Sequence, residues 1–404
     1  MNKRQPRRVA LIVESSATPR RRMLAGVARY MHEHEPWALY LKPFGVEKSL
    51  TKWLTEWKGD GIIAAIADPD IEAWSRVSIP VVDVVGVLSK SGMPLVRTND
   101  RAVGRLGAEH LLERGYRTFA FIEYSEHGWS TTRRAGFQEA LSQSGYECTV
   151  HVMAYPYAGT GGPEQWEQQQ QTLAEWINQL PKPIGVMCST DLMGQQFLEA
   201  CLRVGAVVPE EIAVVAADND EQICQICCPP LSSVIINDEQ RGYMAASMLN
   251  KMMDGEAPPK ETIWVEPAGV FSRASTDILA VDDIAIVTAL RLIRDHACDG
   301  LAVDDVVRKV FLSRSVLERR FRKAVGRPIN SEIIRVRLNR AVQLLCETRL
   351  ELKVIALKAG FGSTSYMTAV FRDKLGRTPG SYRGVSRGRE SQSAVAEANV
   401  MADG

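Results

Sequence analysis

The chain has 404 residues, of which 45% are hydrophobic, and its charge is nearly balanced, with 49 Lys and Arg against 48 Asp and Glu. This length predicts two or three globular domains with an ordinary composition. Apolar runs fall short of the roughly 20 residues that a membrane-spanning helix needs, and the N-terminus does not read as a signal peptide, so we expect a cytoplasmic protein without a membrane partner.

After a short tail at residues 1–7, the sequence alternates apolar runs with amphipathic segments up to residue 273. Apolar runs of this kind, bounded by Gly or Pro, are typical of parallel strands that are covered on both faces. The predicted strands are Val9–Val13, Gly61–Ile66, Val81–Val85, Phe119–Ile122, Ile184–Cys188 and Ile212–Ala216, and the predicted helices are Arg101–Arg114, Thr132–Ser144, Leu192–Val204 and Glu239–Met253. We therefore predict a doubly wound α/β domain over residues 8–273, divided into two lobes.

Polar or aromatic side chains follow several of the predicted strands. They are Asp68, Trp129, Arg133, Asp191, Asp218 and Asn219. Open α/β sheets bind ligands at the carboxyl ends of their strands. Carboxylates and arginine can bond the hydroxyls of a sugar, and tryptophan can stack on its apolar face. Helix capping or surface solvation explains any single carboxylate equally well, but the shared position favours a sugar site.

Charge is segregated along the chain. Residues 301–389 hold 20 Lys and Arg against 7 Asp and Glu, whereas the rest of the chain holds 29 against 41. Strand-like runs stop near residue 273, so we predict a linker at 274–283, an all-helical domain at 284–386 and a disordered tail at 387–404. A basic module beside an acidic one predicts that only the C-terminal part meets a polyanion, the alternative being a solvated basic face.

The basic module contains an internal repeat, because residues 303–327 return at 353–377 with an offset of 50. Each copy predicts two short helices and a tight turn, at 303–325 and 352–375, which is the pattern of a helix-turn-helix. Ser313 and Ser363 are the expected N-caps of the second helices. A connecting helix at 330–346 would place the two units in successive major grooves of duplex DNA. A helical bundle without a DNA role is the alternative.

Each second helix has polar side chains opposite its apolar stripe. Such groups can read base edges in the major groove, and further arginines can hold phosphates. The predicted base-reading residues are Ser315, Glu318, Arg319, Thr364, Ser365 and Thr368, and the predicted phosphate-binding residues are Arg314, Arg320, Arg322, Arg372 and Arg383.

The stretch from Ile355 to Arg383 closely resembles the signature of the AraC/XylS family of transcription regulators. The matching residues are Gly360-Phe361, Ser365-Tyr366, Phe371-Arg372, Gly376, Thr378-Pro379 and Tyr382-Arg383. The resemblance implies sequence-specific binding to double-stranded DNA. Ala369 departs from the pattern, because many members have a longer polar or basic residue there. The first unit lacks the turn glycine, which would alter its turn.

The N-terminal part resembles the effector domain of the LacI/GalR family, which is periplasmic-binding-protein-like. The matching segments are Arg97–Gly104, Glu109–Arg117, Arg133–Phe137, Ser189–Asp191, Gly205–Glu210 and Ala213–Asp218. The resemblance implies a monosaccharide bound between two lobes by Arg133, by Thr190 or Asp191, and by Asp218. Ala216-Ala217 replaces the commoner Gly-aromatic pair, which would change one wall of the pocket.

The two resemblances in this order imply a transcription regulator of a sugar-utilisation operon, and the family favours an activator over a repressor. They imply a pentose effector such as D-xylose, a homodimer on the operator DNA, and RNA polymerase as a partner in activation. No cofactor or metal is predicted, because Cys224, Cys227 and Cys228 lack a second ligand pair at zinc spacing. A sugar-binding protein without a regulatory role and a sugar-processing enzyme are the alternatives, and missing nucleotide and nucleophile motifs argue against an enzyme.

Overall fold

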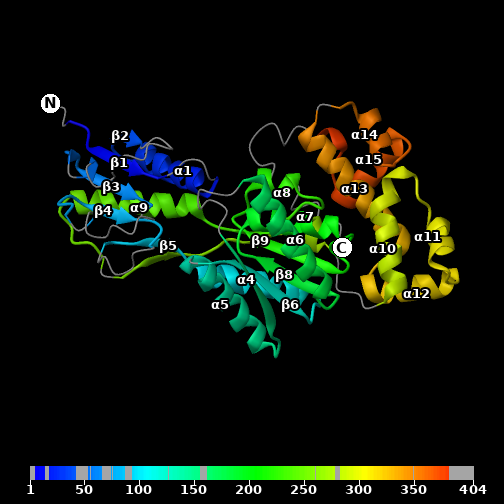
Figure 1. Ribbon diagram of the computed structural model, residues 1–404. Coiled ribbons are helices and arrows are strands. Elements are labelled where there is room, and N and C mark those ends of the chain that lie inside the picture. The colour runs from blue at the N-terminus through cyan, green and yellow to red at the C-terminus, as the bar shows by residue number, and fades with distance from the viewer. Residues whose placement is uncertain are drawn as a thin grey trace.

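The structure is a computed structural model that describes residues 5–13, 18–41, 53–54, 56–65, 74, 76–86, 93–125, 127–154, 162–259, 261–277, 283–348 and 350–381. Two α/β lobes, blue and cyan to green in Figure 1, are followed by an all-helical domain in yellow to red. This order confirms the predicted fold class. The predicted tail 387–404 and the predicted site residues Asp68 and Arg383 lie outside the described residues.

The N-terminal lobe is built on a parallel sheet with the strand order β2-β1-β3-β4. Its strands are β1 (Arg8–Ile12), β2 (Ala38–Leu41), β3 (Gly61–Ala64) and β4 (Val81–Asp83). Side chains alternate across β1, so Val9 and Leu11 pack with helices α1 (Thr18–Glu33) and α9 (Asp238–Met253), whereas Ala10 and Ile12 pack on the opposite face. Both faces are therefore buried, as the continuous apolar run predicted.

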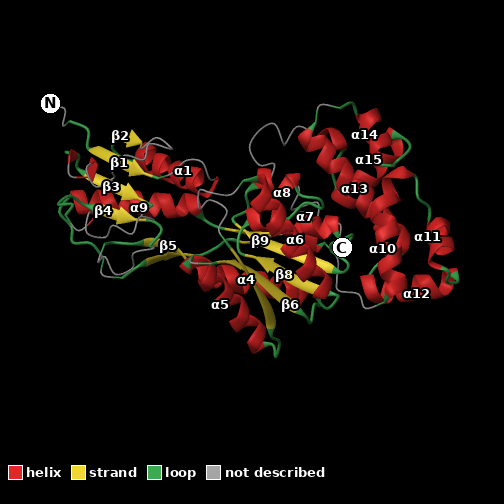
Figure 2. Ribbon diagram, viewed as in Figure 1, coloured by secondary structure: helices red, strands yellow, loops and turns green. Residues whose placement is uncertain are grey.

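The C-terminal lobe has a sheet with the order β12-β10-β9-β8-β6-β7, in which only the pairing of β10 with β12 is antiparallel. The strands are β6 (Phe119–Tyr124), β7 (Cys148–Met153), β8 (Ile184–Cys188), β9 (Ile212–Ala217), β10 (Ser232–Ile235) and β12 (Gly269–Phe271). The helices are α4 (Asp100–Glu113), α5 (Gly128–Gln143), α6 (Pro163–Gln179), α7 (Asp191–Arg203) and α8 (Glu221–Ile226). Figure 2 shows the strands between these helices, which is the predicted doubly wound arrangement.

The chain passes between the two lobes three times. The first passage follows β5 (Val96–Thr98), the second joins β10 to α9, and the third joins β11 (Ile263–Val265) to β12. Strands β5 and β11 pair in parallel beside the first sheet. These passages bring the ends of several strands and the starts of α4 and α9 to the boundary between the lobes.

Helices α4 and α5 cross in unusually close contact. A Cβ atom at Gly104 would lie 1.8 Å from the carbonyl oxygen of Arg133, and one at Gly136 would lie 2.0 Å from that of Arg101. Only glycine leaves room for the facing backbone at such an approach. The two glycines therefore fix the base of Arg133 against the first turns of α4.

The helical domain contains α10 (Ile284–His296), α11 (Val303–Val310), α12 (Arg314–Val325), α13 (Ile329–Glu347), α14 (Leu352–Lys358) and α15 (Thr364–Leu375). One apolar core joins α10, α11, α12 and the start of α13, and a second joins the end of α13 to α14 and α15. Helices α12 and α15 have 12 residues each and start 50 positions apart. The predicted pair of helix-turn-helix units and their connector are present.

Some local predictions were wrong. The predicted alternation did not include the helices α1, α6 and α8 or the strands β2, β5, β7, β10, β11 and β12. Helix α5 begins at Gly128, so Arg133 lies in its second turn instead of at its start. Residues 274–276, predicted to open the linker, form the 3-10 helix η1 (Ala274–Thr276), and Ser275 and Thr276 are buried on the C-terminal lobe. None of the helices in the described residues is long and apolar enough to cross a membrane.

Candidate ligand cleft and nucleic-acid interface

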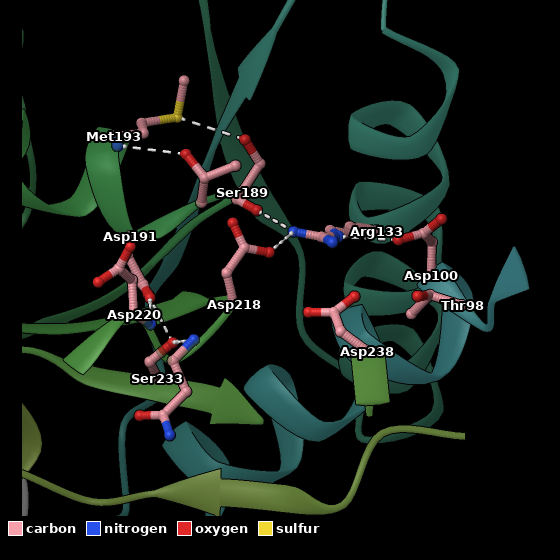
Figure 3. Close-up of polar contacts among 12 residues, drawn as sticks. Thr98, Asp100, Arg133, Ser189, Asp191, Met193, Asp218, Asp220, Ser233 and Asp238 are labelled. Carbon is pink, nitrogen blue, oxygen red and sulfur yellow. Dashed lines mark hydrogen bonds and ion pairs between the residues drawn. The ribbon is translucent and has the colours of Figure 1, made fainter. Parts of the chain in front are cut away.

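Arg133 is the centre of a buried polar cluster at the lobe boundary (Figure 3). Only 6% of the residue is exposed. Its Nε donates to Asp100 Oδ1 at 2.9 Å, and its Nη1 donates to the Ser189 carbonyl at 2.5 Å and to Asp218 Oδ1 at 3.1 Å. The guanidinium also lies over the ring of Trp129, 5.0 Å from its centroid. The structure thus brings together Arg133, Asp218 and Trp129, as the sequence predicted.

The Asp218–Asn219 turn follows β9 and has an unusual backbone, with φ of +109° and +47° at two residues that are not glycine. Such conformations cost about 1–3 kcal/mol each and persist only where the surroundings hold them. The Asn219 N–H donates to Ser233 Oγ at 2.9 Å, and its side-chain Oδ1 accepts from Arg273 at 2.8 Å. The amide of Asn219, a predicted ligand residue, is therefore engaged by Arg273 instead of Arg133.

Thr190 and Asp191, at the start of α7, also have structural partners. Thr190 Oγ1 accepts from the Met193 N–H at 3.2 Å and caps the helix. The carboxylate of Asp191, 1% exposed, accepts from the Asp220 N–H at 2.6 Å and from Ser233 Oγ at 2.5 Å. These contacts tie the start of α7 to the segment after the Asp218–Asn219 turn, so Asp191 supports the geometry of the cleft.

Three charged residues of the cluster were not predicted from the sequence: Asp100, Asp238 and Arg241. Asp100 opens α4 beside Arg133, and Asp238 opens α9 in the other lobe, where Arg241 donates to its Oδ1 at 2.5 Å. The Oδ2 atom of Asp238 is buried and has no hydrogen-bond partner among the described residues. Asp100 lies within the segment Arg97–Gly104 that carried the family resemblance. Asp238 also obeys the strand-end rule, but the four-residue strand before it was not predicted.

Burial controls the protonation of these carboxyls. It raises the pKa of Asp191, and the nearby charge of Asp218 raises it further. It also raises the pKa of Asp218 and of Asp238, against the opposing effects of Arg133 and Arg241. A cluster of acids around two arginines offers both acceptors and donors, which suits a polyhydroxylated neutral ligand.

An open surface pocket of about 440 Å³ lies beside the cluster, between the start of α1 and α8. Its lining residues include Thr18, Arg21, Arg22, Asp220 and Gln222. It draws on both lobes, and its volume falls in the range of small-molecule pockets. Among the residues that the structure describes, no three or more His, Cys, Asp or Glu side chains are grouped so that they could hold a metal ion.

In the first helix-turn-helix unit, the predicted readers Ser315, Glu318 and Arg319 are exposed on α12. Glu318 accepts from Arg314 at 3.3 Å, and Arg314 also pairs with Asp304 at 2.9 Å. Ser313 occupies the predicted N-cap position of α12, but its side chain makes no capping hydrogen bond. Of the predicted phosphate-binding residues, Arg322 is exposed, whereas Arg320 pairs with Asp283 at the start of α10, at 2.5 Å.

In the second unit, Ser365 and Arg372 are exposed and Thr364 and Thr368 are half-buried on α15. Ser363 Oγ accepts from the Tyr366 N–H at 3.2 Å, which confirms its predicted capping role. Thr368 Oγ1 donates to the Thr364 carbonyl at 2.8 Å. Tyr366, 44% exposed, packs edge-on against Phe361 beside the predicted readers and was missed, although it lies within the recognised signature.

Three family models match the chain in order. A XylR N-terminal domain covers residues 8–96, a periplasmic binding protein-like domain covers 108–276, and a helix-turn-helix domain covers 306–384. These matches agree with the two lobes and the two helix-turn-helix units. They define the architecture of a regulator in which a ligand-binding-type domain precedes a DNA-binding-type domain.

Relatives of known identity match almost the whole chain. The xylose operon regulatory protein of Escherichia coli K12 is 33% identical over 94% of this chain and 97% of its own length, and that of Haemophilus influenzae is 30% identical over 93% and 98%. A solved structure described as the xylose-binding transcription activator XylR is 30% identical, with a TM-score of 0.79 over 94% of this chain and 98% of that one. The chain belongs to the family of xylose operon regulatory proteins.

More distant structures support the fold of the α/β part alone. The cellobiose complex of the transcriptional regulator CelR is 23% identical, with a TM-score of 0.56 over 68% of this chain and 86% of that chain. The likeness covers part of the chain only and concerns its fold.

Proposed function

We propose that the protein is a xylose-responsive transcription activator that binds double-stranded DNA. D-xylose binds between the lobes, and the two helix-turn-helix units bind operator DNA. The observation that carries the proposal is the Arg133 cluster, in which buried acids from both lobes surround one arginine, in a chain similar over 94% of its length to a structure described as xylose-binding. The sugar is an effector that is released unchanged, so the protein is not an enzyme.

In this proposal Arg133, Asp218 and Asp238 bond the sugar hydroxyls, and Trp129 covers an apolar face of the ring. Asp238 has a buried oxygen that lacks a partner among the described residues, and a sugar hydroxyl would satisfy it. Asp191 and Thr190 hold the cleft in shape. The exposed residues of α12 and α15 read bases, with Arg322 and Arg372 on phosphates.

The regulator acts as a homodimer in the cytoplasm, where it recruits RNA polymerase. Dimeric regulators bind two half-sites separated by whole turns of the duplex, and tandem units in each subunit would extend the site. Sugar binding selects the lobe arrangement for which it has the higher affinity, which changes the placement of the DNA-binding helices.

A thermal-shift experiment tests the sugar. D-xylose should raise the melting temperature of the full-length protein more than equal concentrations of L-arabinose, D-ribose or D-glucose, because a ligand that binds only the native state stabilises it. An NMR spectrum of D-xylose before and after incubation should be unchanged. Equal shifts with all four sugars, or a converted sugar, would contradict the proposal.

A selection experiment tests the DNA. The full-length protein with D-xylose should enrich one sequence motif from a random duplex library, and fluorescence anisotropy should then show tighter binding to that duplex with the sugar than without it. Failure to enrich any motif at low salt would remove the DNA-binding part of the proposal.

A further inference from the structure

Two polar contacts join the helical domain to the rest of the described chain. Arg335 of α13 pairs with Asp277, the residue after η1. Arg294 of α10 donates to the Val208 carbonyl at 2.8 Å and pairs with the buried carboxylate of Glu210. Both contacts end on the C-terminal lobe, and within the described residues no hydrogen bond reaches from the helical domain to the N-terminal lobe. The C-terminal lobe is therefore the route from the cleft to the DNA-binding helices.

The Asp218–Asn219 turn lies where this route begins. Its Asp218 carboxylate is bonded by Arg133. Its two carbonyl oxygens accept from Arg22 of the N-terminal lobe, at 3.0 Å and 2.5 Å. Its Asn219 side chain accepts from Arg273, the residue before η1, at 2.8 Å. One turn is thus contacted by Arg133, which is proposed to bind the sugar, by Arg22 of the opposite lobe, and by Arg273 of the segment that leads to the linker.

The backbone of this turn is held in a strained conformation by contacts from outside the turn. Its two positive φ values store strain that the three arginines and Ser233 restrain. A sugar that competes for the Asp218 carboxylate, or a lobe movement that withdraws Arg22, removes part of that restraint. Switches in proteins commonly use an element that changes between two discrete arrangements, and a strained turn held by outside contacts is suited to that role.

The segment that leads to the linker, residues 273–277, is fixed on the C-terminal lobe by several hydrogen bonds. Ser232 Oγ accepts from the Arg273 N–H at 2.7 Å and bonds Thr276 Oγ1 at 2.7 Å. Ser275 Oγ donates to the Val214 carbonyl at 2.6 Å. These bonds leave the chain from Arg273 to Asp277 little freedom to deform by itself, so we expect a displacement at Arg273 to extend to the ion pair of Asp277 with Arg335.

We propose that the Asp218–Asn219 turn transmits the state of the sugar cleft to the DNA-binding domain through Arg273, η1 and the Asp277–Arg335 ion pair. The inference rests on the proposed function, since it assumes that sugar and DNA both bind. Arg273 is a positioning residue: it contacts the turn and not the cluster around Arg133. In this relay the ion pair of Arg294 with Glu210 attaches the helical domain to the C-terminal lobe at a second point, which serves as the pivot when the first point is displaced.

The test measures coupling between sugar and DNA in the full-length protein. Coupling is the ratio of DNA affinities with and without saturating D-xylose, measured by anisotropy on the duplex selected with the wild type. Thermodynamic linkage requires that DNA changes the affinity for D-xylose by the same factor. Calorimetry of D-xylose binding with and without DNA measures that factor independently. Arg273→Lys keeps the charge but loses the fork that reaches both Asn219 and the Leu231 carbonyl.

The matched control is Arg203→Lys in the same lobe. Arg203 stacks on an aromatic ring as Arg273 does, 4.8 Å from the Trp166 centroid against 4.3 Å from that of Phe271, and its ion pair with Glu167 lies away from the turn and the linker. Asp277→Asn is a second test variant, which breaks the ion pair with Arg335 at nearly unchanged volume. Circular dichroism confirms that each variant is folded.

Arg273→Lys and Asp277→Asn should each bind D-xylose, without DNA, as tightly as the wild type and lose roughly tenfold in coupling. The double variant should lose no more, because the two contacts act in series, and Arg203→Lys should couple normally. Wild-type coupling in both test variants, loss of sugar binding in Arg273→Lys, or additive losses in the double variant would overturn the relay. A wild type that binds neither D-xylose nor DNA would contradict the proposed function itself.

Discussion

The cleft and the DNA-binding face both depend on arginine, but they hold it differently. Arg133 is buried and bonded to Asp100, Asp218 and a carbonyl group. Arg319 and Arg372 are exposed, and no hydrogen bond of either guanidinium group is recorded among the described residues. A buried charge needs partners at all times, whereas an exposed one is solvated by water until DNA replaces it. A substitution in the cleft should therefore affect folding and binding together, and one on the DNA-binding face should affect binding alone.

The largest effect is expected for Arg133→Ala. It leaves Asp100 and Asp218 without their common partner, and breaking a buried ion pair in this way costs about 3–5 kcal/mol. The midpoint of urea unfolding should fall and D-xylose binding should be lost. Arg101→Ala is the control, because Arg101 joins the same two helices through an exposed ion pair with Glu139. Equal destabilisation by both substitutions would remove the distinction between buried and exposed arginines.

A smaller effect is expected for the DNA-binding face. Arg319→Ala should weaken binding to the selected duplex by about 1–3 kcal/mol and relax the sequence preference at one base pair. Arg372→Ala should weaken binding to all duplexes alike and lower the slope of log affinity against log salt concentration by about one. Anisotropy titrations at several salt concentrations separate the two. Melting temperatures should stay at the wild-type value, and a drop in either variant would mean that these arginines support the fold.

The pH dependence of stability should come from the cleft. Burial raises the pKa of Asp191, so the folded state holds this proton more tightly than the unfolded state. Proton binding to Asp191 therefore stabilises the folded state. This stabilisation is complete below the unfolded pKa of about 4 and is lost as pH rises through the folded pKa. Asn can accept from the Asp220 N–H and donate to Ser233 Oγ, so Asp191→Asn should melt a few degrees higher than the wild type at high pH. If the difference in melting temperature between Asp191→Asn and the wild type were the same at every pH, Asp191 would not titrate in this range.

The smallest effect concerns the turn of the first helix-turn-helix unit. Phe311 is 93% exposed and has φ of +56°, a backbone that glycine adopts more easily. Phe311→Gly should raise stability by up to about 1 kcal/mol, seen as a higher urea midpoint. The contrast is Gly360→Ala in the second unit, where a Cβ would lie 2.7 Å from Cys298 Cα, so stability should fall. A loss of stability in Phe311→Gly would mean that the phenylalanine has a packing role.

The helical domain was predictable because its information is local. The helical spacing of apolar residues, the two serines at the helix starts and the 50-residue offset all lie within short windows, and the helix bounds agree closely with the predicted units. Even there, whether a serine caps its helix depends on the rotamer, and Ser363 does so while Ser313 does not.

The cleft was predictable only in part, because its contacts join distant segments. Arg133, Asp218 and Trp129 could be grouped by their positions after strands. Arg22 could not, because it belongs to a basic run typical of a solvated surface and contacts residues 196 positions away. Strand β10 was missed because its Ser232 and Ser233 are polar, although both are fully buried and hydrogen-bonded, and with it the position of Asp238 was lost.

The three passages of the chain between the lobes have a consequence for how such proteins can be recombined. Neither lobe is a continuous stretch of sequence, so a single exchange point inside the α/β part would leave both lobes incomplete. The helical domain starts after the last passage and is one uninterrupted segment. A gene fusion at the linker can therefore supply a sugar sensor with a new DNA-binding module, and we expect functional chimaeras to have their junctions between residues 277 and 283.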